Sequence, residues 1–147
     1  MIISGALPLN VQQAVDALCS GELVGLPTET VYGLAADASN TSAVAKIFKA
    51  KGRPSNHPLI VHVASADEVK KFASDVPVFA QALMAQFWPG PLTLILPRHE
   101  HMATAAAGGQ NSVGLRCPSH PMAHQVLKAC ADKGVWGVAA PSANLFG

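Results

Sequence analysis

Two cations stand close together where a helix is expected to end. Lys51 and Arg53 are separated only by Gly52, and four of the ten basic residues lie between Lys46 and Arg53. The glycine leaves the loop free to turn both side chains toward one anion. A guanidinium offers a planar fork that suits phosphate, whereas an ammonium acts as a mobile point charge. The pair predicts a phosphate-bearing ligand, although a solvated helix C-terminus also favours cations.

Hydroxyl and amide groups gather at two other turns. Thr28 and Thr30 follow Pro27, which lacks a backbone donor and ends the pairing of a preceding strand. Ser142 and Asn144 are two positions apart, so they share a strand face or a loop edge. Such side chains either satisfy neighbouring backbone groups or bind a ligand, and the pattern leaves both interpretations open.

A glycine loop leads into a short apolar segment that ends in an arginine. Side chains alternate along a strand, so Ser112 and Arg116, four positions apart, are expected on one face. Backbone N–H groups of the preceding Gly108–Gln110 loop can cradle a phosphate. The sequence contains neither GxxxxGK[ST] nor a GxGxxG that follows a strand, so phosphate binding would use another scaffold.

The histidines and cysteines do not form a recognisable metal site. His62 lies within an apolar run, where a histidine is either a core residue or a ligand-binding group. The other five histidines have no carboxylate or cysteine partners at zinc spacing, so no metal ligated by side chains is predicted. Cys19, Cys117 and Cys130 form no CxxC pair and are expected to be reduced and mostly buried.

Alternating helices and strands are predicted to position these groups. Apolar periodicity predicts helices over 9–18, 41–49, 67–73, 78–87 and 122–131, and strands over 23–26, 58–63, 92–96, 112–116 and 135–140. Asn40 or Thr41 is expected to cap the second helix, Val31–Leu34 to form a short helical turn, and Ala103–Gln110 to form a loop. The alternation indicates one α/β or α+β domain over residues 1–147.

Composition limits the class of protein. Hydrophobic residues make up 50% of the 147 positions and charged residues 13%, which indicates a chain with a real core and excludes a disordered one. The net charge of +1 supplies no overall attraction to nucleic acid or membrane. No leader or membrane-length apolar run is present, so we expect a cytoplasmic protein. The chain stops soon after a strand-loop signal, and we expect a truncated C-terminus.

Several segments follow the order found in one enzyme family. They are Pro27–Leu34, Lys51–Pro54, Pro58–His62, Trp88–Thr93, Val113–Pro118 and Ser142–Asn144. Over nearly its whole length the chain resembles the YrdC-like threonylcarbamoyl-AMP synthases. The resemblance implies an α/β (α+β) fold, with an open, twisted, mixed sheet flanked by helices around a concave basic cavity.

The resemblance also implies an activity. Family members condense L-threonine, bicarbonate or CO2, and ATP to threonylcarbamoyl-AMP and pyrophosphate, which begins threonylcarbamoyladenosine (t6A) synthesis in tRNA. Mg2+ held mainly through the ATP phosphates is implied, as is a downstream tRNA threonylcarbamoyl-transfer machinery. Positioning and charge neutralisation matter more in such a reaction than a dedicated nucleophile.

Site roles carry over position by position. The resemblance implies that Thr30, His62 and Arg116 hold L-threonine, with Arg116 pairing to its carboxylate. The implied ATP contacts are Lys51, Arg53, His57, Ser112, Ser142 and Asn144. Among these, Lys51 and Arg53 are implied to assist catalysis by offsetting charge. His57 stands where the family commonly has Asn, and Leu145–Gly147 lacks the Ser that often follows.

Two other functions stay open at this point. The same concave basic surface could bind double-stranded RNA as a binding module. The scaffold could also serve as a carbamoyltransferase-type domain within a larger enzyme.

Overall fold

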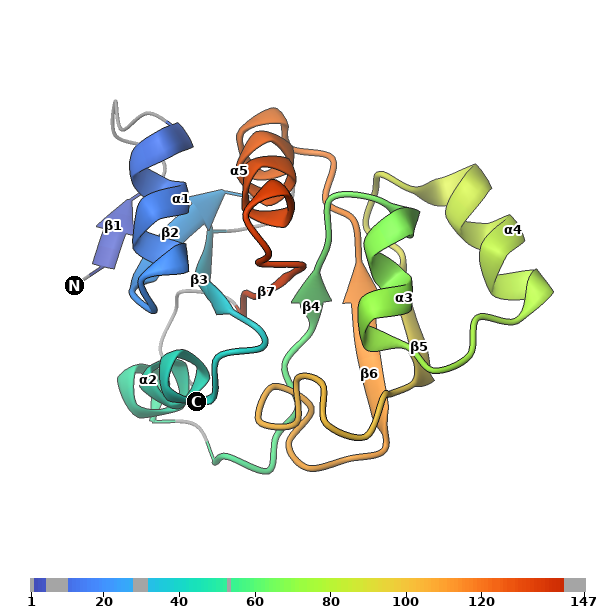
Figure 1. Cartoon of the computed structure of the whole chain (residues 1–147), viewed down its shortest axis with the longest axis horizontal. Coiled ribbons are helices and arrows are strands. Elements are labelled where there is room, and N and C mark those ends of the chain that lie inside the picture. Colours follow the sequence, from blue (N-terminus) through green and yellow to red (C-terminus); the bar gives the residue numbers. More distant parts are fainter. Residues whose placement is uncertain (1, 5–10, 28–31, 53, 142–147) are drawn as a thin grey trace.

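Seven strands form one mixed sheet in the computed structural model, which describes residues 2–4, 11–27, 32–52 and 54–141. The strand order is β1-β2-β3-β7-β4-β6-β5 (Figure 1). The strands are β1 (Ile2–Ser4), β2 (Leu23–Pro27), β3 (Tyr32–Asp37), β4 (Val61–His62), β5 (Thr93–Pro97), β6 (Ser112–Arg116) and β7 (Val138–Ala139). The β1–β2 and β4–β6 pairs are parallel, and the other neighbouring pairs are antiparallel.

Helices connect the strands of the described chain. They are α1 (Val11–Cys19), α2 (Thr41–Lys51), α3 (Val69–Phe72), α4 (Val78–Phe87) and α5 (Pro121–Asp132), with a 3-10 turn, η1 (Ala66–Glu68), before α3. The predicted cap of α2 is confirmed, because the Asn40 side chain accepts a hydrogen bond from Ala43 N at 3.1 Å. Gly52 ends α2 in the left-handed region, with a φ of 63°, and donates to the carbonyls of Phe48 and Lys49.

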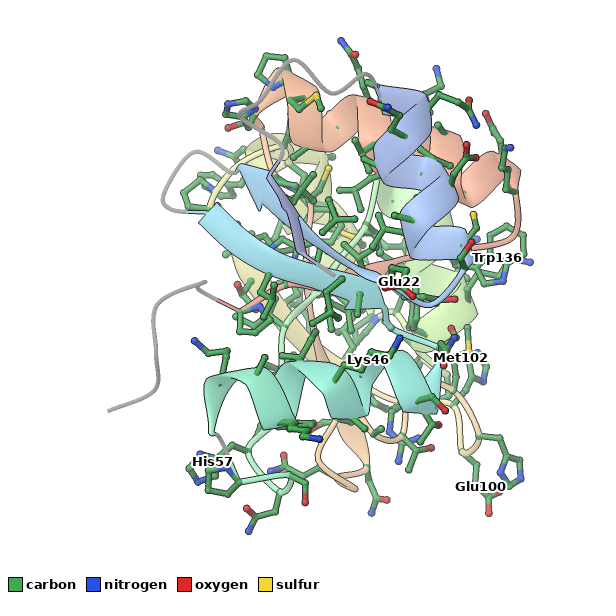
Figure 2. The ribbon with its side chains drawn as sticks, turned by 90° about the vertical axis from the view of Figure 1, so that its left-hand side faces the viewer. Glu22, Lys46, His57, Glu100, Met102 and Trp136 are labelled. Atoms are coloured by element: carbon green, nitrogen blue, oxygen red, sulfur yellow. The ribbon has the colours of Figure 1, made fainter. Side chains whose placement is uncertain are left out.

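Apolar side chains form two clusters on opposite faces of the sheet. Along β3, Leu34 and Ala36 belong to one cluster and Ala35 to the other, as strand alternation requires. Residues of α2, α3 and α4 join the first cluster, and residues of α1 and α5 join the second. Figure 2 accordingly shows β2 and β3 between α2 on one side and α1 with α5 on the other. The sheet is therefore covered on both faces at this end.

The other end of the sheet carries exposed apolar side chains on one face. On β4 and β6, Val61 and Leu115 are fully buried in the first cluster. On the opposite face, Ile60 and Ile95 are 41% and 73% exposed. Gly114 lies between them on that face, because a Cβ there would stand 3.7 Å from Ile60 Cγ1. We call this surface of β4, β6 and β5 the open face.

The predicted helical turn at Val31–Leu34 is wrong. Residue 31 lies outside the described residues, and from Tyr32 the chain forms β3, antiparallel to β2. Leu34 N also donates to Pro141 O at 2.8 Å, from a segment more than a hundred residues later in the chain. Distant backbone partners therefore decide the conformation here, which local sequence could not reveal.

Two predicted strands are shorter than their apolar runs. In the run over 58–63, only Val61 and His62 lie in a ladder, because Leu59 N bonds to Ala106 O in a loop. In the run over 135–140, Val135 N bonds back to Cys130 O at the end of α5. By contrast, α4 and β6 have the predicted limits, Val78–Phe87 and Ser112–Arg116.

Candidate functional site

Three basic side chains are buried among the described residues. Lys51, His62 and Arg116 are 6%, 3% and 9% exposed, whereas every other described Lys, Arg or His is at least partly accessible. Burying a charge is costly, so such positions usually have a specific task. All three were singled out from the sequence as ligand-binding residues.

His62 and Arg116 lie directly opposite each other on neighbouring strands. The parallel register of β4 and β6 pairs Val61 with Leu115 and His62 with Arg116. Because Val61 and Leu115 point into the first core cluster, His62 and Arg116 point to the other face. That face is the open face, so the register brings an imidazole and a guanidinium together at its edge.

The Arg116 side chain is anchored by a neighbouring turn. Its Nε donates a hydrogen bond to the carbonyl oxygen of Gly90 at 3.3 Å. Gly90 N in turn donates to Cys117 O at 2.8 Å. A guanidinium that is buried and fixed in this way suits a planar anion such as a carboxylate.

Ser112 and Arg116 share the open face, as the period of two predicted. The antiparallel register places Ser112 opposite Pro97 and Arg116 opposite Thr93, at the two ends of β6. The half-buried Ser112 hydroxyl and the guanidinium are therefore separated along β6 by Gly114, which has no side chain. The open face thus has polar groups at both ends of β6, with the exposed apolar side chains of Ile60 and Ile95 on either side of Gly114 between them.

Lys51 is the last residue of α2, and its burial distinguishes it from its neighbours. Lys46 and Lys49 on the same helix are exposed, so a solvated helix end describes them but not Lys51. Figure 2 shows Lys46 directed toward Glu22, and its Nζ lies 3.8 Å from Glu22 Oε1. His57 is half-buried just beyond the loop that follows α2, where its N–H donates to Pro54 O. Figure 2 places it below the end of that helix.

Four predicted site residues lie outside the described residues, namely Thr30, Arg53, Ser142 and Asn144. The described residues that flank two of these segments lie close together. Pro141 O accepts the hydrogen bond from Leu34 N, and a Cβ at Gly33 would stand 3.0 Å from Ala140 Cβ. The fold therefore brings Gly33 and Leu34 of β3 next to Ala140 and Pro141.

The cysteines are free, as predicted, and have no features of a reactive centre. Burial raises the pKa of the Cys130 thiol to about 12, with smaller contributions from Cys19 and Asp37, so the thiol stays protonated at neutral pH. Cys117 Sγ donates to Ala64 O and lies on the face opposite Arg116. Cys19 is exposed, so the expectation that the thiols are mostly buried is wrong for this residue.

Neither a metal cluster nor a membrane helix is found in the described parts of the chain. No three His, Cys, Asp or Glu side chains there come together as metal ligands. The helices described above also include none that is long and apolar enough to cross a bilayer.

Comparisons with known proteins identify the family. A profile of the Sua5/YciO/YrdC family, described as telomere recombination, matches residues 16–147. A threonylcarbamoyl-AMP synthase of Halorhodospira halophila is 34% identical over 141 residues, which are 95% of this chain and 73% of that protein. The chain belongs to the Sua5/YciO/YrdC family. This confirms the family predicted from the sequence motifs.

Longer members of the Sua5/YciO/YrdC family are also similar to the chain. Threonylcarbamoyl-AMP synthases of Bacillus subtilis and Pyrococcus abyssi are 46% and 42% identical over 94% of this chain. The chain spans 39% of the length of each. The crystal structure of P. abyssi Sua5 complexed with L-threonine has a TM-score of 0.89 and 40% identity, and it covers all of this chain and 43% of that one. The predicted α/β class and open mixed sheet are thereby confirmed.

One contact of the site was missed by sequence reasoning. Gly90 lies in the Trp88–Thr93 segment, which was matched as a family motif without any partner being predicted for it. Its contact with Arg116 depends on the pairing of β5 with β6. A signal existed in the sequence, since a glycine between two prolines immediately before a strand indicates a constrained turn.

Proposed function

We propose that this chain forms the domain that makes threonylcarbamoyl-AMP from L-threonine, bicarbonate or CO2, and ATP, with release of pyrophosphate. The observation that carries the proposal is the similarity to the H. halophila synthase across nearly three quarters of that protein. The burial of Lys51, His62 and Arg116 supports the proposal, because the sequence resemblance implies ligand-binding roles for these three residues and burial is unusual for basic side chains. The product would pass in the cytoplasm to the tRNA threonylcarbamoyl-transfer machinery for t6A synthesis.

L-threonine would bind at the edge of the open face. Arg116 would pair with the carboxylate through its fixed guanidinium, while His62 beside it and Thr30 would contact the rest of the amino acid. The solved P. abyssi relative contains L-threonine, which supports an amino-acid site in this fold. The buried setting also strengthens a charge pair relative to one in water.

ATP would bind toward the loop after α2. Its proposed contacts are Lys51, Arg53, His57, Ser112, Ser142 and Asn144. Lys51 supports this placement because it is a buried cation at the start of that loop. Mg2+, where it accompanies the nucleotide, supplies further neutralisation of phosphate charge. No carboxylate cage is found for it in the described residues, so it would be held mainly through phosphate oxygens.

The proposed reaction requires orientation more than a nucleophilic side chain. The threonine amine adds to CO2, which gives a carbamate and a proton. A carbamate oxygen then forms a bond to the α-phosphorus of ATP, and the bond to the pyrophosphate oxygen breaks. Arg116 would hold the amino acid for this attack, and Lys51 with Arg53 would offset the charge that grows on the phosphates.

The direct test is product formation by the full-length protein. It is incubated with ATP, Mg2+, L-threonine and labelled bicarbonate, and both pyrophosphate and labelled threonylcarbamoyl-AMP are measured. We expect both products, and neither when threonine is omitted. Tight RNA binding with a steep salt dependence, together with no threonine-dependent pyrophosphate, would instead favour an RNA-binding module.

A further inference from the structure

The turn between α4 and β5 holds the end of β6 at two adjacent residues. Gly90 O accepts the hydrogen bond from Arg116 Nε at 3.3 Å, and Gly90 N donates to Cys117 O at 2.8 Å. Both backbone polar groups of this buried glycine are therefore directed at β6. The contact joins a loop to the one buried arginine of the described chain.

Only glycine fits at this position of the turn. A Cβ at Gly90 would lie 2.5 Å from the Phe87 carbonyl oxygen, which is closer than real Cβ contacts. The turn is also fixed at both sides. Trp88 N donates to Met84 O and continues α4, while Trp88 Nε1 donates to Leu92 O at 2.9 Å across the turn. The Gly90 carbonyl is thus presented to β6 from a rigid support.

We infer that Gly90 is a positioning residue that orients the Arg116 guanidinium for a ligand carboxylate. A carboxylate can meet a guanidinium at the edge formed by Nε and one terminal nitrogen, or end-on at the two terminal nitrogens. The Gly90 carbonyl occupies Nε–H, so the ligand is directed to the end-on approach. This inference rests on the proposed function, in which Arg116 binds the threonine carboxylate.

One measurement of this contact needs no ligand. The chain contains three arginines, Arg53, Arg98 and Arg116, so their Nε–H signals in a nitrogen-15 NMR spectrum can be assigned by substitution. We expect slow hydrogen exchange at Arg116 Nε–H in the wild-type protein. In Gly90→Ala the bond from Arg116 Nε to the carbonyl of residue 90 is weakened, and losing the net free energy of one hydrogen bond should speed exchange at least about threefold. Equal exchange rates in the two proteins would overturn the inference.

Ligand binding then tests the positioning role. L-threonine affinity is measured by calorimetry for Gly90→Ala with Arg116 present and in an Arg116→Lys background. With Arg116, Gly90→Ala should weaken binding about three- to tenfold. In the Arg116→Lys background the side chain has no Nε–H donor of this kind, so Gly90→Ala should change affinity less than about twofold. An equal loss in both backgrounds would indicate general loosening and would overturn the inference.

Two further variants guard against a folding defect. Trp88→Phe keeps an aromatic ring but loses the hydrogen bond to Leu92 O, so it should also weaken L-threonine binding. This variant replaces Gly90→Ala as the test if Gly90→Ala does not fold. Gln81→Ala is the matched control, because it removes a bond to Val76 O at the other end of α4 and should leave threonine affinity unchanged. A loss in Gln81→Ala equal to that in Trp88→Phe would contradict the inference.

The same experiments separate the inference from the proposed function. If Arg116→Lys weakens threonine binding but neither turn variant does, the positioning role fails and the proposed function stands. If the wild-type protein does not bind L-threonine, the proposed function fails. The ligand part of the inference then falls with it, while the exchange rate at Arg116 Nε–H still decides whether Gly90 restrains this side chain.

Discussion

The close approach of β3 to the chain after β7 gives a quantitative prediction for Gly33→Ala. A Cβ at Gly33 would lie 3.0 Å from Ala140 Cβ and 3.1 Å from Ala140 O, whereas ordinary contacts begin at 3.4 Å. Alanine must therefore push Ala140 away by a few tenths of an ångström and strain the bond between Leu34 N and Pro141 O. Crowding of this kind costs about 1–3 kcal/mol. Alanine recovers about 0.4–1 kcal/mol by restricting the unfolded chain.

We therefore expect Gly33→Ala to lower the free energy of unfolding by about 1.3 kcal/mol, the centre of a net range of about 0–2.6 kcal/mol, measured by urea denaturation. Gly114→Ala is the matched control, because it is also a strand glycine on a sheet face. Its Cβ would stand 3.5 Å from Thr93 Cγ2 and 3.7 Å from Ile60 Cγ1, at ordinary contact distances. Gly114→Ala should leave the free energy of unfolding unchanged or raise it slightly. Equal stability of the two variants would refute the argument that the approach of Ala140 requires glycine.

Three other predictions concern ligands and pH. Arg116→Ala should weaken L-threonine binding by about 1.5–3 kcal/mol with little effect on ATP, measured by calorimetry, and an equal loss of both ligands would indicate unfolding instead. Lys51→Ala should weaken ATP binding by a similar amount, while Lys49→Ala on the exposed face of α2 should not. The raised pKa of Cys130 means that the folded protein holds this proton more tightly, so stability should fall as pH rises from about 9 toward 12, by at most about 1.4 kcal/mol per pH unit. Urea unfolding of Cys130→Ala should lack this part of the slope, and an unchanged slope would contradict the prediction.

Local sequence patterns predicted those features that depend on one segment. The limits of α4 and β6 follow from periodicity, and the start of α2 follows from the capping preference of Asn40. Ser112 and Arg116 were placed on one face because alternation along a single strand requires no knowledge of its neighbours. Motif order then identified the family, which periodicity alone could not do.

Features that depend on two distant segments were beyond these patterns. Residues 32–37 form a strand because β2 and the chain near Pro141 supply backbone partners, and neither partner is visible in the local sequence. Its apolar run alone made His62 compatible with a core role, and only the register of β4 and β6 places it opposite Arg116. The burial of Lys51 likewise depends on how the end of α2 packs, whereas its charge alone was compatible with an anion-binding loop or a solvated helix end.

Because β4 and β6 are far apart in the sequence, the position of His62 opposite Arg116 depends on a long-range step of folding. These residues come from strands separated along the chain by η1, α3, α4 and β5, so their approach closes a long loop. A shift of β4 by one residue would turn His62 into the core and bring Val61 or Val63 to the open face. At the proposed amino-acid site, regain of binding during refolding would therefore report when β4 and β6 have met in the correct register.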